Sequence, residues 1–202
     1  MTDKEFFYTI DKTASATFTD RGSRFIAIAF PAATKDDYKK HLAGVKTEHP
    51  KASHYCFAYR LGLDGNNFRS GDDGEPAGTA GKPILGQIDS KELTNILIIV
   101  VRYFGGSLLG VPGLINAYKT AASLVLQVTP VIQKQVEINY RLQFDYTLMN
   151  DIMTMVKQYN CSILNQEMQL FCSMTIGIPI NRTDAMLNRL KDMHTVELTK
   201  IN

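Results

Sequence analysis

Three carboxylates lie close together in one glycine-rich segment, GDDGEPAGTAGKP, where Asp72, Asp73 and Glu75 fall within four residues. Carboxylates at this spacing can hold a hard cation or act as an acid and a base. Solvated acids of a turn are the structural alternative. A third interpretation is that one of them pairs with Arg102 and organises the loop, because a buried guanidinium and a buried carboxylate need each other.

A second glycine-rich segment, RYFGGSLLG, carries Arg102, Tyr103, Phe104, Gly105 and Gly106. It follows a β-branched run and precedes a helical pattern, so freed backbone amides and the guanidinium could form a concave anion site. A tight turn from strand to helix is the alternative. The segment lacks both the GK[ST] ending of a phosphate-binding loop and the GxGxxG pattern of a dinucleotide site, which favours the turn.

Aromatic and basic side chains in and near these segments could contact nucleic acid. Tyr103 and Phe104 could stack on bases. Phosphates could be contacted by six basic residues, Arg24, Arg60, Arg69, Lys82, Arg102 and Lys119. Aromatic residues are also ordinary components of a core, so packing is an equal alternative.

His54 and Cys56 lie two positions apart in a predicted strand and therefore share one face. A nucleophile with its base is one interpretation, but pairing along a single strand is geometrically awkward, and no aspartate or asparagine is evident to orient the ring. Packing is the favoured interpretation. We assign no catalytic residue, and we expect neither a metal nor a cofactor.

The composition is that of an ordinary globular protein. Of the 202 residues, 45% are hydrophobic and 21% charged, and the net charge of +2 does not by itself imply nucleic-acid binding or any DNA specificity. No apolar segment reaches the roughly 18 residues of a membrane span, and the amino terminus lacks a signal-peptide pattern. The three cysteines lack metal-type spacing and fit reduced thiols, so we expect a cytoplasmic protein.

The length favours two domains, each able to bury a core, over a single larger α/β unit. The hydrophobic pattern changes near Gln133, so we expect an α+β chain with domains at residues 1–133 and 134–202.

Strands and helices alternate in the expected first domain. Residues 23–30 and 53–61 are predicted strands, a short partner ends near Ser70, and the nearly unbroken apolar run at 94–101 predicts a strand buried on both faces. Helices are predicted after a cap at Thr34, around Pro83, and from Gly113 to Pro130.

The expected second domain opens with strict alternation over residues 136–144, which is typical of a half-buried strand. A helix face, a short strand near 162–165, alternation over 168–176, a second helix face and a strand at 195–201 follow. The order β-α-β-β-α-β is that of the split β-α-β arrangement.

Four ordered motifs closely resemble those of the IMPACT/YigZ family: SRFIA at 23–27, HYCFAY at 54–59, DDGEPAGTAGKP at 72–83, and VVRYFGG with LG and GL-NAY at 100–118. The resemblance spans nearly the whole first domain. It implies a first domain like the second domain of a small-subunit ribosomal protein. It also implies a ferredoxin-like second domain that resembles the carboxy-terminal part of elongation factor G.

The resemblance further implies translation control, a link to the general-control kinase pathway, and RNA, ribosomes or translation factors as partners. Our leading hypothesis is a noncatalytic regulatory protein whose contacts to RNA or another anion come from Arg24, Lys82, Arg102, Tyr103, Phe104, Gly105, Gly106 and Lys119. His54, Asp72, Asp73 and Glu75 would organise the loop or contact the ligand. The alternatives are a magnesium-dependent enzyme or binding protein for a phosphorylated or nucleotide ligand, and a pure protein-interaction module.

Overall fold

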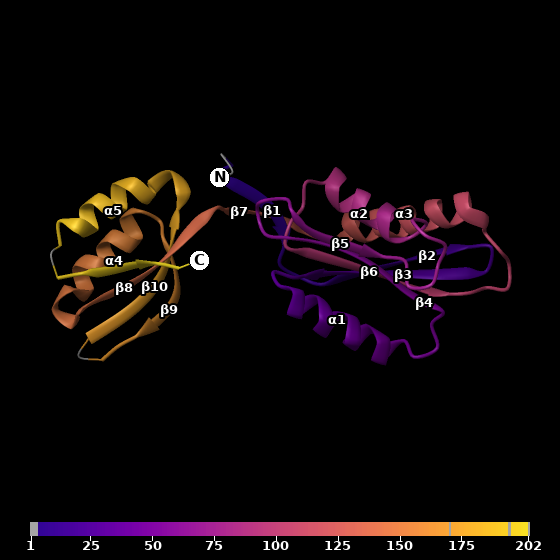
Figure 1. Cartoon of the computed structure of the whole chain (residues 1–202), viewed down its shortest axis with the longest axis horizontal. Coiled ribbons are helices and arrows are strands. Elements are labelled where there is room, and N and C mark those ends of the chain that lie inside the picture. Colours follow the sequence, from indigo (N-terminus) through magenta and orange to yellow (C-terminus); the bar gives the residue numbers. More distant parts are fainter. Residues whose placement is uncertain (1–3, 170, 194, 202) are drawn as a thin grey trace. The chain divides into compact units, whose positions relative to one another are not determined.

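The computed structural model describes residues 4–169, 171–193 and 195–201. The chain folds into two compact units, each containing helices and strands (Figure 1). One unit contains residues 7–134, and the other contains residues 4–6 with those from 135 onward.

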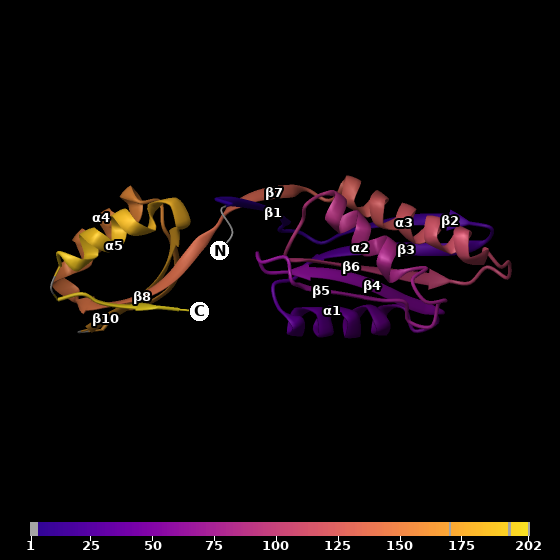
Figure 2. The ribbon, with the colours of Figure 1, turned by 45° about the horizontal axis from the view of Figure 1, so that its top comes forward.

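The first unit is built on a five-stranded antiparallel sheet of spatial order β2-β3-β6-β4-β5. Helix α1 (Lys35–Glu48) lies on one face, and helices α2 (Gly81–Ser90) and α3 (Gly110–Val128) lie on the other (Figure 2). The strands are β2 (Ala14–Asp20), β3 (Ser23–Pro31), β4 (His54–Leu61), β5 (Asn67–Gly71) and β6 (Ile96–Tyr103).

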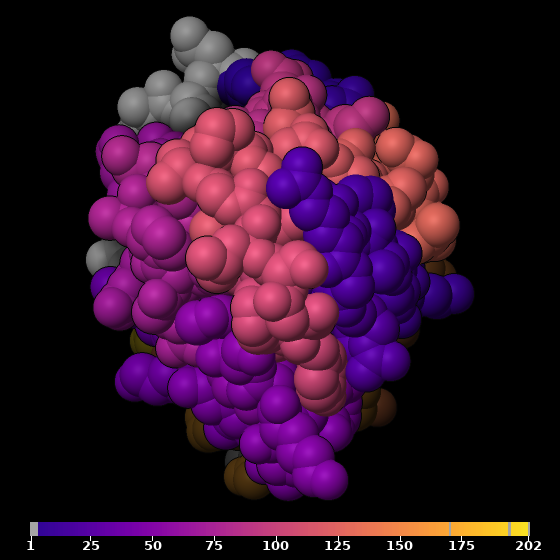
Figure 3. Space-filling view, turned by 90° about the vertical axis from the view of Figure 1, so that its right-hand side faces the viewer, coloured from indigo at the N-terminus to yellow at the C-terminus, as the bar shows by residue number. Residues whose placement is uncertain are grey.

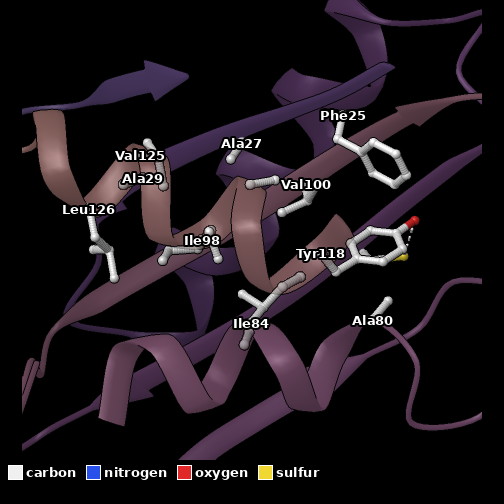
Figure 4. Close-up of a cluster of buried hydrophobic side chains, with 14 of the residues drawn as sticks. Phe25, Ala27, Ala29, Ala80, Ile84, Ile98, Val100, Tyr118, Val125 and Leu126 are labelled. Atoms are coloured by element: carbon white, nitrogen blue, oxygen red, sulfur yellow. Dashed lines mark hydrogen bonds between the residues drawn. The ribbon is translucent and has the colours of Figure 1, made fainter. Parts of the chain in front are cut away.

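Strand β6 is the centre of this sheet, and its side chains from Ile96 to Arg102 are all buried. Because side chains alternate between the faces of a strand, β6 contributes to two separate apolar clusters. Figure 4 shows the cluster beneath α2 and α3, in which Ile98 and Val100 lie with Val125 and Leu126. The prediction of a central strand buried on both faces is confirmed.

Two of the predicted helix starts are confirmed. The Thr34 hydroxyl accepts a hydrogen bond from the Asp37 amide, and the Asp37 carboxylate accepts one from the Thr34 amide, so a capping box begins α1. Helix α2 has Pro83 in its first turn, where a missing N–H costs no intrahelical bond.

Helix α3 starts at Gly110, earlier than the predicted start at Gly113. Pro112 lies in the first turn, whose amides have no intrahelical acceptor, so the helix extends back through it. The helix ends at Val128, before Pro130 as predicted. Neither α3 nor any other helix among the described residues is long and apolar enough to cross a membrane.

Three strands were not expected from the sequence. Strands β1 (Phe6–Ile10) and β7 (Val131–Gln135) form a two-stranded sheet, and β2 pairs with β3 at the edge of the large sheet. The sequence of β2, ASATFTD, alternates small and hydroxyl side chains rather than large apolar and polar ones, so its period-2 signal is weak.

The second unit has the predicted β-α-β-β-α-β order, and its sheet has the spatial order β11-β8-β10-β9. Single 3₁₀ turns at Tyr146–Leu148 and Ile180–Arg182 precede helices α4 (Met149–Gln158) and α5 (Thr183–Lys191). The strands are β8 (Glu137–Asp145), β9 (Ser162–Glu167), β10 (Phe171–Pro179) and β11 (Glu197–Lys200). Strand β10 starts later than the predicted Met168, which is exposed.

Candidate functional site

A buried ion pair joins the two glycine-rich segments of the first unit. The guanidinium Nη1 of Arg102 lies 2.6 Å from Oε1 of Glu75, and the two side chains are only 6% and 4% exposed. The Tyr118 hydroxyl donates a 2.8 Å hydrogen bond to the same carboxylate oxygen. The expectation that Arg102 pairs with one of the three loop acids is therefore met, and the acid is Glu75.

Aromatic rings cover the Arg102 guanidinium. Its Cζ lies 5.4 Å from the centroid of Phe25 and 5.5 Å from that of Phe104, and its Nη2 donates to the Ser23 hydroxyl at 3.3 Å. A guanidinium enclosed in this way has little surface to offer a phosphate. Its burial therefore favours the interpretation in which Arg102 pairs with a loop acid and organises the loop over a direct contact between Arg102 and RNA.

Asp72 organises the acidic loop by accepting three backbone hydrogen bonds. The donors are the amides of Gly78 (2.8 Å), Ala80 (3.0 Å) and Gly81 (2.8 Å), in the segment that leads into α2. The cap residue of α2 is Ala80, whose side chain cannot accept a hydrogen bond. Burial by itself would raise the pKa of Asp72, but the three amide hydrogen bonds outweigh it and the pKa is lowered. The carboxylate therefore stabilises the loop in its ionised form.

We expect Asp72→Asn to lower the free energy of unfolding of the first unit by about 2 kcal/mol at pH 7, because hydrogen bonds to a charged acceptor are lost. The folded pKa lies below the unfolded value of about 3.9, so this stabilisation is complete above that value and disappears as the pH falls through the folded pKa. Urea titrations between pH 7 and pH 2 should show the difference from the wild type shrinking below about pH 4. Asp11→Asn, at an exposed position, is the control, and a difference that is independent of pH would contradict the assignment.

Asp73 and His54 hold the start of the same loop against β4. The Asp73 carboxylate accepts a 2.7 Å hydrogen bond from the Tyr55 amide, and the His54 Nδ1–H donates to the Asp73 carbonyl oxygen at 2.8 Å. His54 Nε2 lies 3.9 Å from the Glu75 carboxylate. The three acids thus have three different sets of partners, and the described part of the chain contains no group of three or more His, Cys, Asp or Glu side chains suited to a metal. They do not form the magnesium site that their spacing allowed.

Two backbone amides of the turn after β6 donate to serine hydroxyls of the same unit. The Phe104 amide donates to the Ser53 hydroxyl at 3.2 Å, and the Gly105 amide donates to the Ser23 hydroxyl at 3.1 Å. These two contacts agree with the tight strand-to-helix turn, the interpretation that the sequence favours over an anion site. Gly106 is exposed and has open space around it.

Cys56 is packed beneath the loop. Its thiol lies 3.0 Å from the Asp72 carbonyl oxygen and 3.3 Å from the Tyr118 hydroxyl, and the side chain is fully buried. Burial raises the pKa of the Cys56 thiol, which opposes formation of a thiolate nucleophile. This geometry agrees with the favoured packing interpretation.

The other predicted binding residues lie on different faces of the first unit. The exposed Arg24 guanidinium lies 4.7 Å from the centroid of Tyr103, whose hydroxyl is 3.0 Å from His49 Nδ1 on the α1 side. Lys82 and Lys119 are exposed on α2 and α3, which cover the opposite face. The structure thus separates Arg24 and Tyr103 from the two lysines.

Phe104 is the predicted aromatic residue that remains accessible, with 48% of its surface exposed. Figure 3 views the molecule from the end at which β6 leaves the sheet, and the segment that follows β6 (pink) lies between the first strands (indigo) and the acidic loop (magenta).

Tyr118, Ser23 and Ser53 were missed as members of the site. A signal existed for Tyr118, because it is the polar-tipped residue in the buried stripe of α3 that includes Leu114, Ala117 and Ala121. The serines carry no comparable signal, because they reach the site only through strand pairing and loop packing.

The fold and the site define a class: a two-unit α+β protein whose first unit closes a glycine-rich turn over a buried arginine–glutamate pair. Residues 21–126 match the family model described as the Impact N-terminal domain. The chain is 34% identical to the Escherichia coli K12 protein called IMPACT family member YigZ, over 84% of each chain. The chain belongs to the IMPACT family, as the motifs predicted.

Two solved structures are also similar to this chain. A crystal structure described as a hypothetical protein superposes with a TM-score of 0.76 at 30% identity and covers 98% of both chains. The structure of Yih1, described as a two-domain translational regulator, is 30% identical over 57% of this chain and 46% of its own, with a TM-score of 0.38.

Proposed function

We propose that this protein is a regulator of translation that binds RNA or ribosomes through the end of the first unit where β6 leaves the sheet. The family supports this proposal. The chain belongs to the IMPACT family, and the resemblance of its motifs to that family implies translation control. Under this proposal the first unit corresponds to the ribosomal-protein-like domain, and the second to the domain resembling the carboxy-terminal part of elongation factor G.

The observation that carries the proposal is the exposed Phe104 ring, which is backed by the buried Arg102. The exposed Arg24 lies against the ring of Tyr103, the residue before Phe104. Arg24 is also paired in register with Tyr103. An aromatic ring packed against a buried guanidinium offers a stacking surface for a base, and an exposed guanidinium at the same end of the sheet can contact a phosphate. In this proposal Arg24 takes the place of Arg102 as the phosphate contact at this end of the sheet, and Lys82 and Lys119 offer charge on the helical face.

We expect Phe104→Ala and Arg24→Ala each to weaken binding to single-stranded RNA or to purified ribosomes by about tenfold, since stacking and phosphate contacts are each lost. Fluorescence anisotropy with labelled RNA between about 50 and 200 mM salt, together with sucrose-gradient co-sedimentation with and without RNase, measures this.

Phe68→Ala is the matched control. Phe68 is 52% exposed and also carries an arginine against its ring, with Arg60 Cζ 5.1 Å from the centroid, but it lies on the edge strand β5. It should leave binding unchanged. No association of the wild type with RNA or ribosomes at low salt would overturn the proposal, as would an equal loss in the Phe68 variant.

A further inference from the structure

One face of the five-stranded sheet is only partly covered by helices. On the opposite face α2 lies over β4 and β5, and α3 lies over β2 and β3, whereas α1 stands alone on its face (Figure 2). Tyr38 of α1 packs against Phe57 and Tyr59 of β4. Five strands span roughly 19 Å and one helix covers roughly 10 Å, so α1 cannot cover the whole face. Its His41 ring stacks on Phe30 of β3 at 4.3 Å between ring centroids, and β2 lies beyond β3 at the edge of the sheet.

A groove of about 630 Å³ occupies this position, between α1 and the strands β2 and β3. Its floor includes the apolar side chains Ile26, Ile28 and Phe30 of β3, and Ser15 of β2 lies beside Ile28. The floor from Ile26 to Phe30 is roughly 13 Å long, and the α1 wall from Lys40 to His49 has about the same length. A helix of two to three turns matches these dimensions.

Gly44 in the α1 wall has no packing role within the first unit. A Cβ added there meets no atom within 4 Å, yet a glycine inside a helix costs about 1 kcal/mol relative to alanine. Glycine in such a position lets another backbone approach closely. Because Gly44 lines the groove, it leaves room there for the backbone of an occupant.

Together with the nearby Arg24, the charged side chains around the groove have an excess of one positive charge when the histidines are neutral. Lys40, His41 and His49 line it from the α1 side, and Glu48 is the acid among the lining residues. Arg24, two positions before Ile26 and therefore on the same face of β3, continues the floor with an exposed guanidinium. The complementary occupant is therefore acidic.

We propose that this groove binds an acidic amphipathic helix of a partner protein. A narrow apolar stripe of that helix lies against Ile26, Ile28 and Phe30, its backbone approaches Gly44, and its carboxylates face Lys40 and Arg24. An added β-strand would instead pair at the free edge of β2 and leave this apolar floor uncovered. Arg24 is shared with the RNA-binding proposal, whereas Lys40 and Gly44 line this groove, so Lys40→Glu and Gly44→Leu test this proposal separately from the first.

The test uses the full chain and a fluorescein-labelled synthetic helix with leucine at positions i, i+3, i+4 and i+7 and glutamate on its other faces. Anisotropy should show saturable binding that Gly44→Leu weakens at least about tenfold, because leucine occupies the groove. Lys40→Glu should also weaken binding, and a helix carrying lysine in place of glutamate should reverse the preference between the wild type and Lys40→Glu.

Gly86→Leu is the matched control, because Gly86 is also a helical glycine with open space around its Cβ position but lies on α2. It should bind the acidic helix as the wild type does. A second arm places a photo-crosslinking residue at Ser15 in cells and sequences the captured segment. Capture of an acidic helical segment supports the proposal. Capture of a basic or extended segment, failure of the acidic helix to bind, or equal affinities of Gly44→Leu and the wild type would overturn it.

Discussion

Glu75→Ala should lower the free energy of unfolding of the first unit by about 3–5 kcal/mol, the loss typical of breaking a buried ion pair from one side. The variant leaves the Arg102 guanidinium charged and buried without its carboxylate, and it removes the acceptor of the Tyr118 hydroxyl. An unpaired buried charge costs far more than the pair itself contributes, so the effect should exceed that of any surface substitution.

Chemical denaturation followed by circular dichroism and tyrosine fluorescence measures this loss. The matched control is Asp89→Ala, which breaks the Arg60–Asp89 ion pair at 2.7 Å, where the side chains are 21% and 43% exposed. That pair is screened by water, so we expect a change below about 1 kcal/mol. The double variant Glu75→Leu with Arg102→Met removes both charges and should recover much of the loss. Similar stabilities for Glu75→Ala and Asp89→Ala would contradict the organising role of the buried pair.

Gly105→Ala should lower the free energy of unfolding by about 3 kcal/mol or more through a steric clash. A Cβ at this position would lie 1.9 Å from the Gly22 carbonyl carbon and 2.2 Å from its oxygen, and these atoms belong to the backbone of the tight β2–β3 turn. A backbone cannot move aside as a flexible side chain can, so either the hairpin or the RYFGG turn must shift. The shift would also break the hydrogen bond from the Gly105 amide to Ser23.

Gly106→Ala is the control one residue along the chain. Gly106 has a φ of +85°, but a Cβ added there would have no atom within 4 Å, so the cost is conformational alone, about 1 kcal/mol. Thermal and urea unfolding should rank the wild type first, Gly106→Ala second and Gly105→Ala last. The opposite ranking of the two variants would show that conformation, rather than contact with Gly22, makes Gly105 necessary.

Most of the fold was predictable because its signals are local. The apolar run of β6, the Thr34 capping box and the apolar stripe of α3 each indicate an element from a few neighbouring residues. Helix α3 begins earlier than predicted because a proline in the first turn of a helix costs little. Strand β2 was missed because an edge strand of alternating small and hydroxyl residues lacks a strong period.

The sequence by itself determined the family through its motifs and located the two glycine-rich segments. It also showed that Arg102 needs an acid beside it if that residue is buried. Only the tertiary structure decided that the acid is Glu75, that Asp72 and Asp73 bind backbone amides, and that Phe104 rather than Arg102 faces solvent. The reason is physical: neighbouring acids in one loop have the same local chemistry, and the strand pairing and loop packing that give each a different partner join residues far apart in the chain.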